Sequence, residues 1–211
     1  MPNLPISQLP ELTAMTPNAE FAVAQGGVTY RVKNSTLAPF PTVYGLFSQT
    51  GNSVAVSATT VETTLIDGGV GTLSIPANGF SVGDSFRADF AGVFSCANNQ
   101  TIRLRIKDGY FILADSGLQQ ITNITNAVWS LSINFTIRQV GVAGVASIVT
   151  LGVFRYSKTV NGTIEGFSFN EVNNTTFDTT LSNTLDVTVQ WGSDNAGNNI
   201  FTDIFVLNKI Y

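Results

Sequence analysis

The stretch Trp129-Ser130-Leu131-Ser132-Ile133-Asn134-Phe135-Thr136-Ile137-Arg138 alternates large apolar residues with polar ones throughout. Successive side chains of a β-strand point to opposite faces of the sheet, so this alternation predicts a strand with one buried and one solvated face. Similar segments continue from residue 43 onward, with turn signals between them such as Asp108-Gly109 and Asn161-Gly162. Val, Ile, Thr and Phe are common, and runs of Glu, Lys and Leu that favour helices are missing.

The spacing of these segments predicts the fold class. Strands are expected at 43–49, 53–58, 60–67, 70–75, 85–95, 101–107, 110–115, 127–139, 145–160, 163–169, 174–180, 184–191 and 200–210. Because no helix separates them, we expect antiparallel pairing into two packed sheets. The prediction for residues 43–211 is therefore an all-β, antiparallel β-sandwich of jelly-roll type, and an immunoglobulin-like sandwich is the alternative.

Residues 1–42 differ from the rest in composition. Prolines stand at positions 2, 5, 10, 17, 39 and 41, which predicts an extended segment with little regular structure. Within it, two alternating runs over 20–25 and 28–33 flank Gly26-Gly27 and predict a tight β-hairpin. A single helical turn is expected at 34–37. A lone hairpin is only marginally stable in water, so this one is expected to need a partner surface.

The charge balance argues against two classes of partner. The formal charge is −4 and the isoelectric point is near 4.6, so no nucleic-acid partner is expected. The tightest basic group, Arg103, Arg105 and Lys107, is expected on the solvated face of one strand. The uncharged stretch between Arg138 and Arg155 is too short for a membrane-spanning helix, and no membrane insertion is expected.

The residues that usually carry catalysis are scarce. The chain has no histidine and a single cysteine, Cys96, which is expected to act as a small buried apolar residue. Asp84 and Asp89 are the candidates for a glycosidase-type pair, but we expect turn and surface carboxylates there. We therefore predict that the protein is not an enzyme, and that it has no cofactor and no metal site.

The last segment of the chain is apolar on both sides. Ile204, Val206 and Ile210 would face one way, and Phe205, Leu207 and Tyr211 the other. One side suffices for the core of a sandwich, so either another copy of the chain or the N-terminal segment should cover the second side, and a contact with another copy is favoured. Phe205, Leu207 and Tyr211 are predicted to form that contact.

A glycan site is a weaker hypothesis. Trp191 continues the apolar side of the segment 184–191 and is expected in the core. If it instead lay at a sheet edge, its ring together with Asp194 and Asn195 in the following loop would suit sugar recognition.

The N-terminal residues also resemble a known group of proteins. The motif Ile6-Ser7-Gln8-Leu9-Pro10 and the hairpin Val23-Ala24-Gln25-Gly26-Gly27-Val28-Thr29-Tyr30-Arg31-Val32 resemble the N-terminal attachment segments of phage fibre and virion appendage proteins. The resemblance covers about the first 37 residues, and it implies a virion anchor formed by Ile6, Leu9, Phe21, Val23, Tyr30 and Val32. The remainder looks like the trimeric jelly-roll heads of viral fibres and tumour-necrosis-factor-like proteins.

These expectations define one function and one alternative. The first is a virion structural protein on the capsid or tail surface, a short head fibre or decoration protein. It would dock on a capsid or tail component through residues 1–42 and project a homotrimeric β-sandwich formed by 43–211. The alternative is an adhesion protein of the tail-fibre type that binds a receptor or glycan on the host surface. A depolymerising enzyme ranks third.

Overall fold

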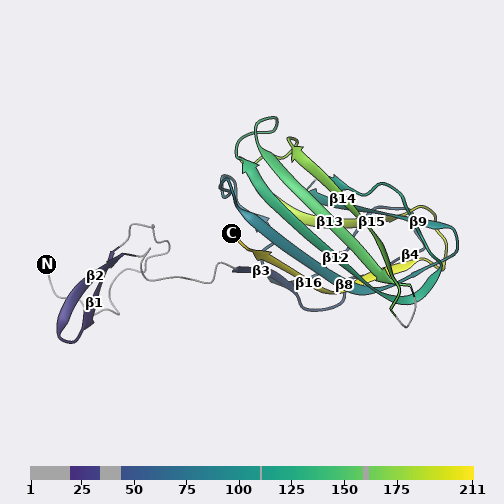
Figure 1. Ribbon diagram of the computed structural model, residues 1–211, viewed down its shortest axis with the longest axis horizontal. Helices are drawn as coiled ribbons and strands as arrows, with labels where there is room; N and C mark the ends of the chain where they lie inside the picture. The colour runs from purple at the N-terminus through teal and green to yellow at the C-terminus, as the bar shows by residue number, and fades with distance from the viewer. Residues whose placement is uncertain (1–19, 34–43, 110, 159–161) are drawn as a thin grey trace. The chain divides into compact units, whose positions relative to one another are not determined.

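The computed structural model of the chain describes residues 20–33, 44–109, 111–158 and 162–211 (Figure 1). By its internal contacts the chain divides into two units, Met1–Thr42 and Val43–Tyr211. The strands are β1 (Glu20–Gln25), β2 (Val28–Lys33), β3 (Tyr44–Gln49), β4 (Val56–Ser57), β5 (Thr63–Thr64), β6 (Gly69–Gly71), β7 (Ser74–Ile75), β8 (Ser85–Cys96), β9 (Gln100–Asp108), β10 (Phe111–Asp115), β11 (Gln119–Ile121), β12 (Ile124–Gln139), β13 (Ser147–Ser157), β14 (Ile164–Asn174), β15 (Asn183–Trp191) and β16 (Asn199–Lys209).

The first unit contains the hairpin that the sequence predicts. β1 pairs antiparallel with β2, and Gln25 opposes Val28 next to the turn. Gly26 and Gly27 have φ values of 59° and 78°, as a type I′ turn requires, and side chains disfavour this backbone conformation. The helical turn expected at 34–37 lies outside the described residues.

The second unit is an all-β sandwich, which confirms the predicted fold class. One sheet has the order β14-β13-β12-β8-β16-β3-β6 with β4 beside β16, and the other has the order β10-β9-β15-β5 with β11 beside β9 and β7 beside β15. All strand pairs are antiparallel. Figure 1 shows the long strands of the larger sheet side by side in one layer, with β9 and β15 in a second layer. This arrangement is consistent with a jelly roll.

The core lies between the two sheets, where the alternating segments place their apolar residues. On β12 the inward residues Trp129, Leu131, Ile133, Phe135 and Ile137 are all buried, and the residues between them are exposed or half-buried. Burying a large apolar side chain contributes about 1.5–3 kcal/mol, so this row alone strongly favours the predicted register.

The predicted strand pattern differs from the structure in two regions. The strands expected at 53–58 and 60–67 are reduced to β4 and β5, and the one expected at 70–75 is divided between β6 and β7. The strand expected at 174–180 is wrong, because β14 continues to Asn174 and a turn region follows. The Asn174 side chain accepts hydrogen bonds from the backbone and hydroxyl of Thr176, and Asp178 binds Thr180 in the same way. Such local side-chain acceptors compete with sheet pairing and close turns instead.

The final strand corrects the predicted subunit contact. β16 contains a bulge between Thr202 and Ile204 in its pairing with β8. The extra residue reverses the alternation, so Phe205 and Leu207 face the core with 0% and 3% exposure. The assignment of these two residues to a subunit contact is therefore wrong. Tyr211 is 75% exposed, and its assignment remains a prediction.

Candidate interaction surfaces

One face of the N-terminal hairpin contains four of the six positions predicted to form the virion anchor. The register pairs Phe21 with Val32 and Val23 with Tyr30, so these four positions share one face of the two-stranded sheet. Val28 belongs to the same face, and the exposed fractions of Val28 and Tyr30 are 52% and 51%.

The opposite face of the hairpin is different in character. It carries the pairs Glu20 with Lys33, Ala22 with Arg31, and Ala24 with Thr29. The register thus gives the hairpin one face whose positions are apolar except for Gln25, and one face of small or charged positions. The anchor residues Ile6 and Leu9 lie outside the described residues.

The outer face of the larger sheet carries a second apolar surface. We call it the outer strip, and it consists of Phe201, Ile204 and Val206 on β16, Ala91 and Val93 on β8, and Val128 on β12. The register brings these residues together, since Val93 opposes both Phe201 and Val128 while Ala91 opposes Ile204. The bulge in β16 turns Ile204 outward in place of Phe205. As a result Ile204 is 59% exposed, and Val128 on the same face is 62% exposed.

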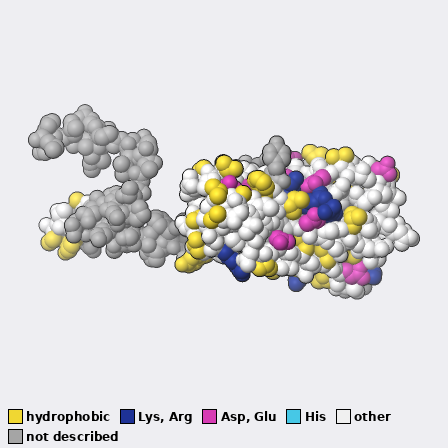
Figure 2. Space-filling model, turned by 90° about the horizontal axis from the view of Figure 1, so that it is seen from above, with side chains coloured by type: hydrophobic (Ala, Val, Ile, Leu, Met, Phe, Trp, Pro, Cys, Tyr) yellow, Lys and Arg dark blue, Asp and Glu magenta, His cyan; other side chains and the backbone are white. Residues whose placement is uncertain are grey.

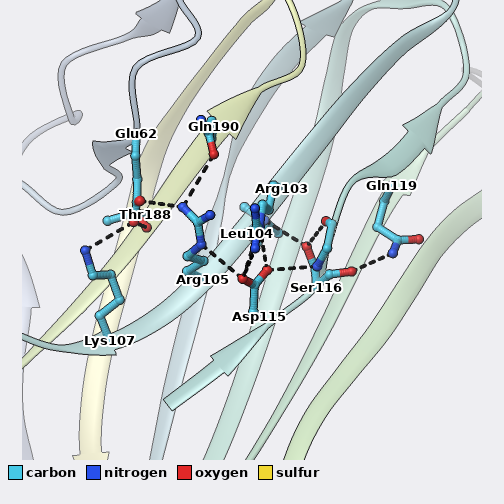
Figure 3. A network of polar contacts seen from close by, with 11 residues as sticks. Glu62, Arg103, Leu104, Arg105, Lys107, Asp115, Ser116, Gln119, Thr188 and Gln190 are labelled. Carbon is cyan, nitrogen blue, oxygen red and sulfur yellow. Dashed lines mark hydrogen bonds and ion pairs between the residues drawn. The ribbon is translucent and has the colours of Figure 1, made fainter. Parts of the chain in front are cut away.

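The outer face of the smaller sheet is polar. The outward residues of β9 and β15 are Thr101, Arg103, Arg105, Lys107, Thr184, Asp186, Thr188 and Gln190. The basic group predicted on a solvated strand face is confirmed, and it is held in a network of ion pairs (Figure 3). On the face shown in Figure 2, one group of dark blue side chains lies against magenta ones, and much of the surface is uncharged.

Arg105 is the centre of this network. Its guanidinium contacts Glu62 through Nη1 and lies 3.1 Å from Asp115 through Nε. Arg103 donates to both oxygens of Asp115, and Lys107 Nζ lies 3.2 Å from Glu62. The side chain of Arg105 is only 12% exposed, so water screens its ion pair with Glu62 little. This ion pair holds the loop that carries Glu62 against the sheet.

The network keeps both of its carboxylates ionised. Burial alone would raise the pKa of the Asp115 carboxyl, but hydrogen bonds from Arg103, the Gly117 N–H and Arg105 outweigh burial and lower this pKa to about 2. Burial would likewise raise the pKa of Glu62. The hydrogen bond from the Thr188 hydroxyl and the charges of Lys107 and Arg105 outweigh burial, so this pKa is lowered. Neither group is suited to donate a proton near neutral pH.

The other carboxylates considered for catalysis are also paired. Asp84 is buried beside Lys209 Nζ at 2.6 Å and accepts a hydrogen bond from the Ser81 N–H. Asp89 lies on the outer face of β8, where it contacts Arg87 Nε at 2.8 Å and accepts from the Ser132 hydroxyl. The structure therefore places them in a turn and on a strand surface, each with its own cation.

Cys96 is buried at the end of β8, as predicted. Its exposed fraction is 1%, and burial raises the pKa of the thiol to about 11. The thiol therefore stays protonated at neutral pH and packs as an apolar group.

The aromatic residue of the hypothetical glycan site is buried in the core. Trp191 is 1% exposed, and its indole Nε1 donates to the Val56 carbonyl at 3.0 Å inside the sandwich. Asp194 and Asn195 lie in the following exposed loop, where Asn195 Oδ1 accepts from the Gly197 N–H and closes a turn. The three residues do not form one surface, so the conditional assignment of Trp191 to sugar stacking is wrong.

One carboxylate lies on the inner side of the sandwich, and sequence reasoning missed it. Asp108 ends the inward row of β9 after Ile102, Leu104 and Ile106, and its exposed fraction is 8%. Burial is the main reason that its pKa is raised to about 6, while the hydrogen bond from the Thr184 N–H opposes the shift. The adjacent Asp108-Gly109 turn hid this inward position, because aspartate before glycine is typical of hairpins.

The raised pKa of Asp108 predicts how stability depends on pH. The folded state holds this proton more tightly than the unfolded state, so the stabilisation is complete below pH 3.8 and is lost as the pH rises through about 6. The variant Asp108→Asn cannot carry the buried charge. At pH 8 its free energy of unfolding is therefore expected to be about 1–3 kcal/mol higher than that of the wild type. Urea unfolding at pH 4 and pH 8 measures the difference, which should shrink at pH 4. An equal difference in the free energy of unfolding at both pH values would contradict the raised pKa of Asp108.

The described residues lack both a metal-ligating cluster and a membrane-spanning helix. Within these residues no group of three or more His, Cys, Asp or Glu side chains is placed to hold a metal ion. In the same part of the chain, no helix is long and apolar enough to cross a membrane.

Comparison with known proteins adds no family to this description. Neither the protein-family models, nor the curated proteins, nor the solved structures include a match to the chain.

Proposed function

We propose that the chain is a structural protein of a virus particle, a short fibre or decoration protein of the head or tail surface. In this proposal the N-terminal hairpin docks on another particle component, and the β-sandwich projects as a homotrimer. The observation that carries the proposal is the amphipathic hairpin, whose described apolar residues Val28 and Tyr30 are each about half exposed.

The hairpin has the features of a docking ribbon. Its apolar positions lie on one face, so a flat partner surface could cover all of them together. Each large apolar side chain that becomes fully buried would contribute about 1.5–3 kcal/mol, less the cost of association. The Gly-Gly turn holds the two strands in register before docking, which lowers the ordering cost.

The sandwich supports the proposed assembly through its two unlike outer faces. The smaller sheet presents a compensated ionic network, and the larger sheet presents the outer strip. Interface cores are poor in charged residues, so the outer strip is the better candidate for contact between copies. Tyr211, 75% exposed, is retained as a proposed contact residue.

A non-catalytic role fits the state of the carboxylates. Glu62, Asp84, Asp89 and Asp115 are each paired with a lysine or arginine. The alternative of a receptor- or glycan-binding tip stays a proposal without a specific supporting contact, because Trp191 is in the core. Its test is binding of the 43–211 fragment to host cells or a glycan array.

The docking proposal is tested with two single substitutions on opposite faces of the hairpin. Tyr30→Asp places a charge on the apolar face, and Thr29→Asp places the same charge on the other face. Particles that lack the protein are incubated with each purified variant, and bound copies are counted by quantitative mass spectrometry. We expect Tyr30→Asp to lose most of the binding, because burying an unpaired carboxylate costs several kcal/mol. Thr29→Asp should bind like the wild type.

Two outcomes would overturn the docking proposal. One is equal incorporation of the two variants, and the other is the absence of wild-type protein from the particles. Circular dichroism of both variants verifies that the sandwich remains folded.

A further inference from the structure

The sandwich has two ends, and the chain enters it at one of them. Tyr44 at the start of β3 opposes Lys209 at the end of β16, and Lys209 also opposes Phe86 near the start of β8. We call this the basal end, and Figure 1 shows the C-terminus and β3 there. β8 has 12 residues, so at about 3.3 Å per residue the opposite, distal end is roughly 35 Å away.

The basal end exposes apolar side chains from two loops and from the end of the chain. The Gly83 N–H donates to the Ile137 carbonyl, and the Ile210 N–H donates to the Ser85 carbonyl, both at 2.8 Å, so these segments are neighbours. Five apolar residues of these segments are between 37% and 62% exposed. We call them the basal surface: Val82 before β8, Val140, Val142 and Val145 between β12 and β13, and Ile210 after β16.

The distal end is polar instead. Its loops 97–99, 122–126 and 192–198 are rich in Asn, Ser and Thr, and no large apolar side chain in these three described loops is exposed. At the basal end, by contrast, residues 76–83 and 140–146 include no charged residue. On the face shown in Figure 2, several yellow side chains lie toward the basal end on the left, and the opposite end is mostly white. The two ends therefore suit different surroundings, since apolar side chains gain from being covered and polar ones do not.

The covalent chain ties the basal end to the hairpin. Residues 34–43 join β2 to β3, and a segment of this length spans at most about 40 Å. In the proposed function the hairpin is bound to a particle component, so that component lies within reach of the basal end and not of the distal end. A short tether gives an effective concentration in the millimolar range, at which a weak apolar contact also forms.

We propose that the basal surface contacts the particle component that binds the hairpin, a proposal that rests on the proposed function. The patch that it meets on this component is apolar and uncharged, because a charge placed against these side chains would lose its water without gaining a partner. The hairpin provides the anchor, and the basal surface sets the orientation. The distal loops then face the solvent.

The proposed trimer leaves this surface available. Contacts between copies through the outer strip use the outer face of the larger sheet, and they do not use the ends of its strands. A second contact on the particle is therefore compatible with assembly through the outer strip.

The test uses two cysteine variants of the full chain. Ala143→Cys places a thiol in the basal loop that contains Val142 and Val145, and Ala196→Cys places one in a distal loop; both alanines are exposed. The native Cys96 does not interfere, because it is buried and its thiol stays protonated. Particles that lack the protein are loaded with each variant, and the rate of labelling by a fluorescent maleimide is compared with that of the free variant.

We expect the Ala143→Cys thiol to react at least about tenfold more slowly on particles than in solution, because the core of an interface excludes the reagent. The Ala196→Cys thiol should react at the same rate in both states. Equal rates for Ala143→Cys in the two states would overturn the basal contact and leave the hairpin docking standing. Slow labelling of Ala143→Cys in the free protein would also overturn it, since a second copy or the hairpin would then cover the surface. Absence of wild-type binding would overturn both proposals.

A pair of charged variants measures the contribution of the contact. Val142→Asp, Val145→Asp should dissociate from particles about tenfold faster than the wild type, because the hairpin alone then holds the chain. Thr125→Asp, Ala196→Asp adds the same charge to exposed positions of the distal end and should dissociate at the wild-type rate. Equal dissociation rates for the two double variants would contradict the basal contact. Circular dichroism verifies that both remain folded.

Discussion

Replacing Phe205 by alanine is expected to lower the free energy of unfolding by about 3–5 kcal/mol. The ring is fully buried, and it stacks on Phe90 with ring centroids 4.1 Å apart and an angle of 8° between the planes. A second ring, Phe47, lies at 5.4 Å. The truncation leaves a cavity between three strands of the larger sheet, which long paired strands cannot readily close. Urea unfolding followed by tryptophan fluorescence measures the loss.

The adjacent residue provides the matched control. Ile204 is next to Phe205 on β16 and is 59% exposed, so Ile204→Ala should cost less than about 1 kcal/mol in the isolated subunit. Dilute protein is used so that subunit contacts do not contribute. A larger loss for Ile204→Ala than for Phe205→Ala would mean that the bulge in β16 is placed wrongly.

The second large effect concerns assembly. The double variant Ile204→Asp, Val128→Asp is expected to dissociate the proposed trimer, so that the mass in solution falls to about a third of the wild-type mass that the proposal predicts. Both side chains belong to the outer strip and are more than half exposed in the single chain. Two carboxylates in the centre of an apolar contact between copies would remain unpaired, at several kcal/mol for each copy. Light scattering after size-exclusion chromatography measures the mass.

The control for assembly uses equally exposed valines elsewhere. Val61 and Val82 are 67% and 62% exposed and lie outside the outer strip. The double variant Val61→Asp, Val82→Asp should keep the mass of the proposed trimer. Dissociation of this control, or a monomeric wild type, would contradict the proposed contact.

The strands of the sandwich were largely predictable because their alternation is local. Leu185, Val187, Val189 and Trp191 face the core as their spacing predicts. Periodicity of two needs no knowledge of the partner strand, so it identifies a strand and its two faces. The Gly26-Gly27 turn is predictable for the same reason, since both residues need positive φ.

The direction of the final strand was not predictable in this way. Ile200 and Thr202 face the core, and a strict alternation would place Ile204 there too. The bulge depends on how β16 fits against β8, and apolar residues on both sides of the segment removed the signal that would reveal it. The assignment of Phe205 and Leu207 to the outside failed for this reason.

The polar network was predictable only in part. The basic residues of the outer strand face were predictable from their alternation. A register shift between Ile112 and Ala114 places Arg105 opposite Asp115, so regular pairing outward from the Asp108-Gly109 turn would have missed this ion pair. Glu62 reaches Arg105 from a loop 43 residues away, and nothing in the local pattern indicates that contact.

The most direct test of the proposed function is a cryo-electron microscopy map of purified virus particles that carry this chain. The proposal predicts sandwich density projecting from the particle surface in threefold groups, with residues 20–33 bound to another component through the face that contains Tyr30 and Val28. A particle without this chain, or one that holds the sandwich directly and leaves the hairpin in solvent, would contradict it.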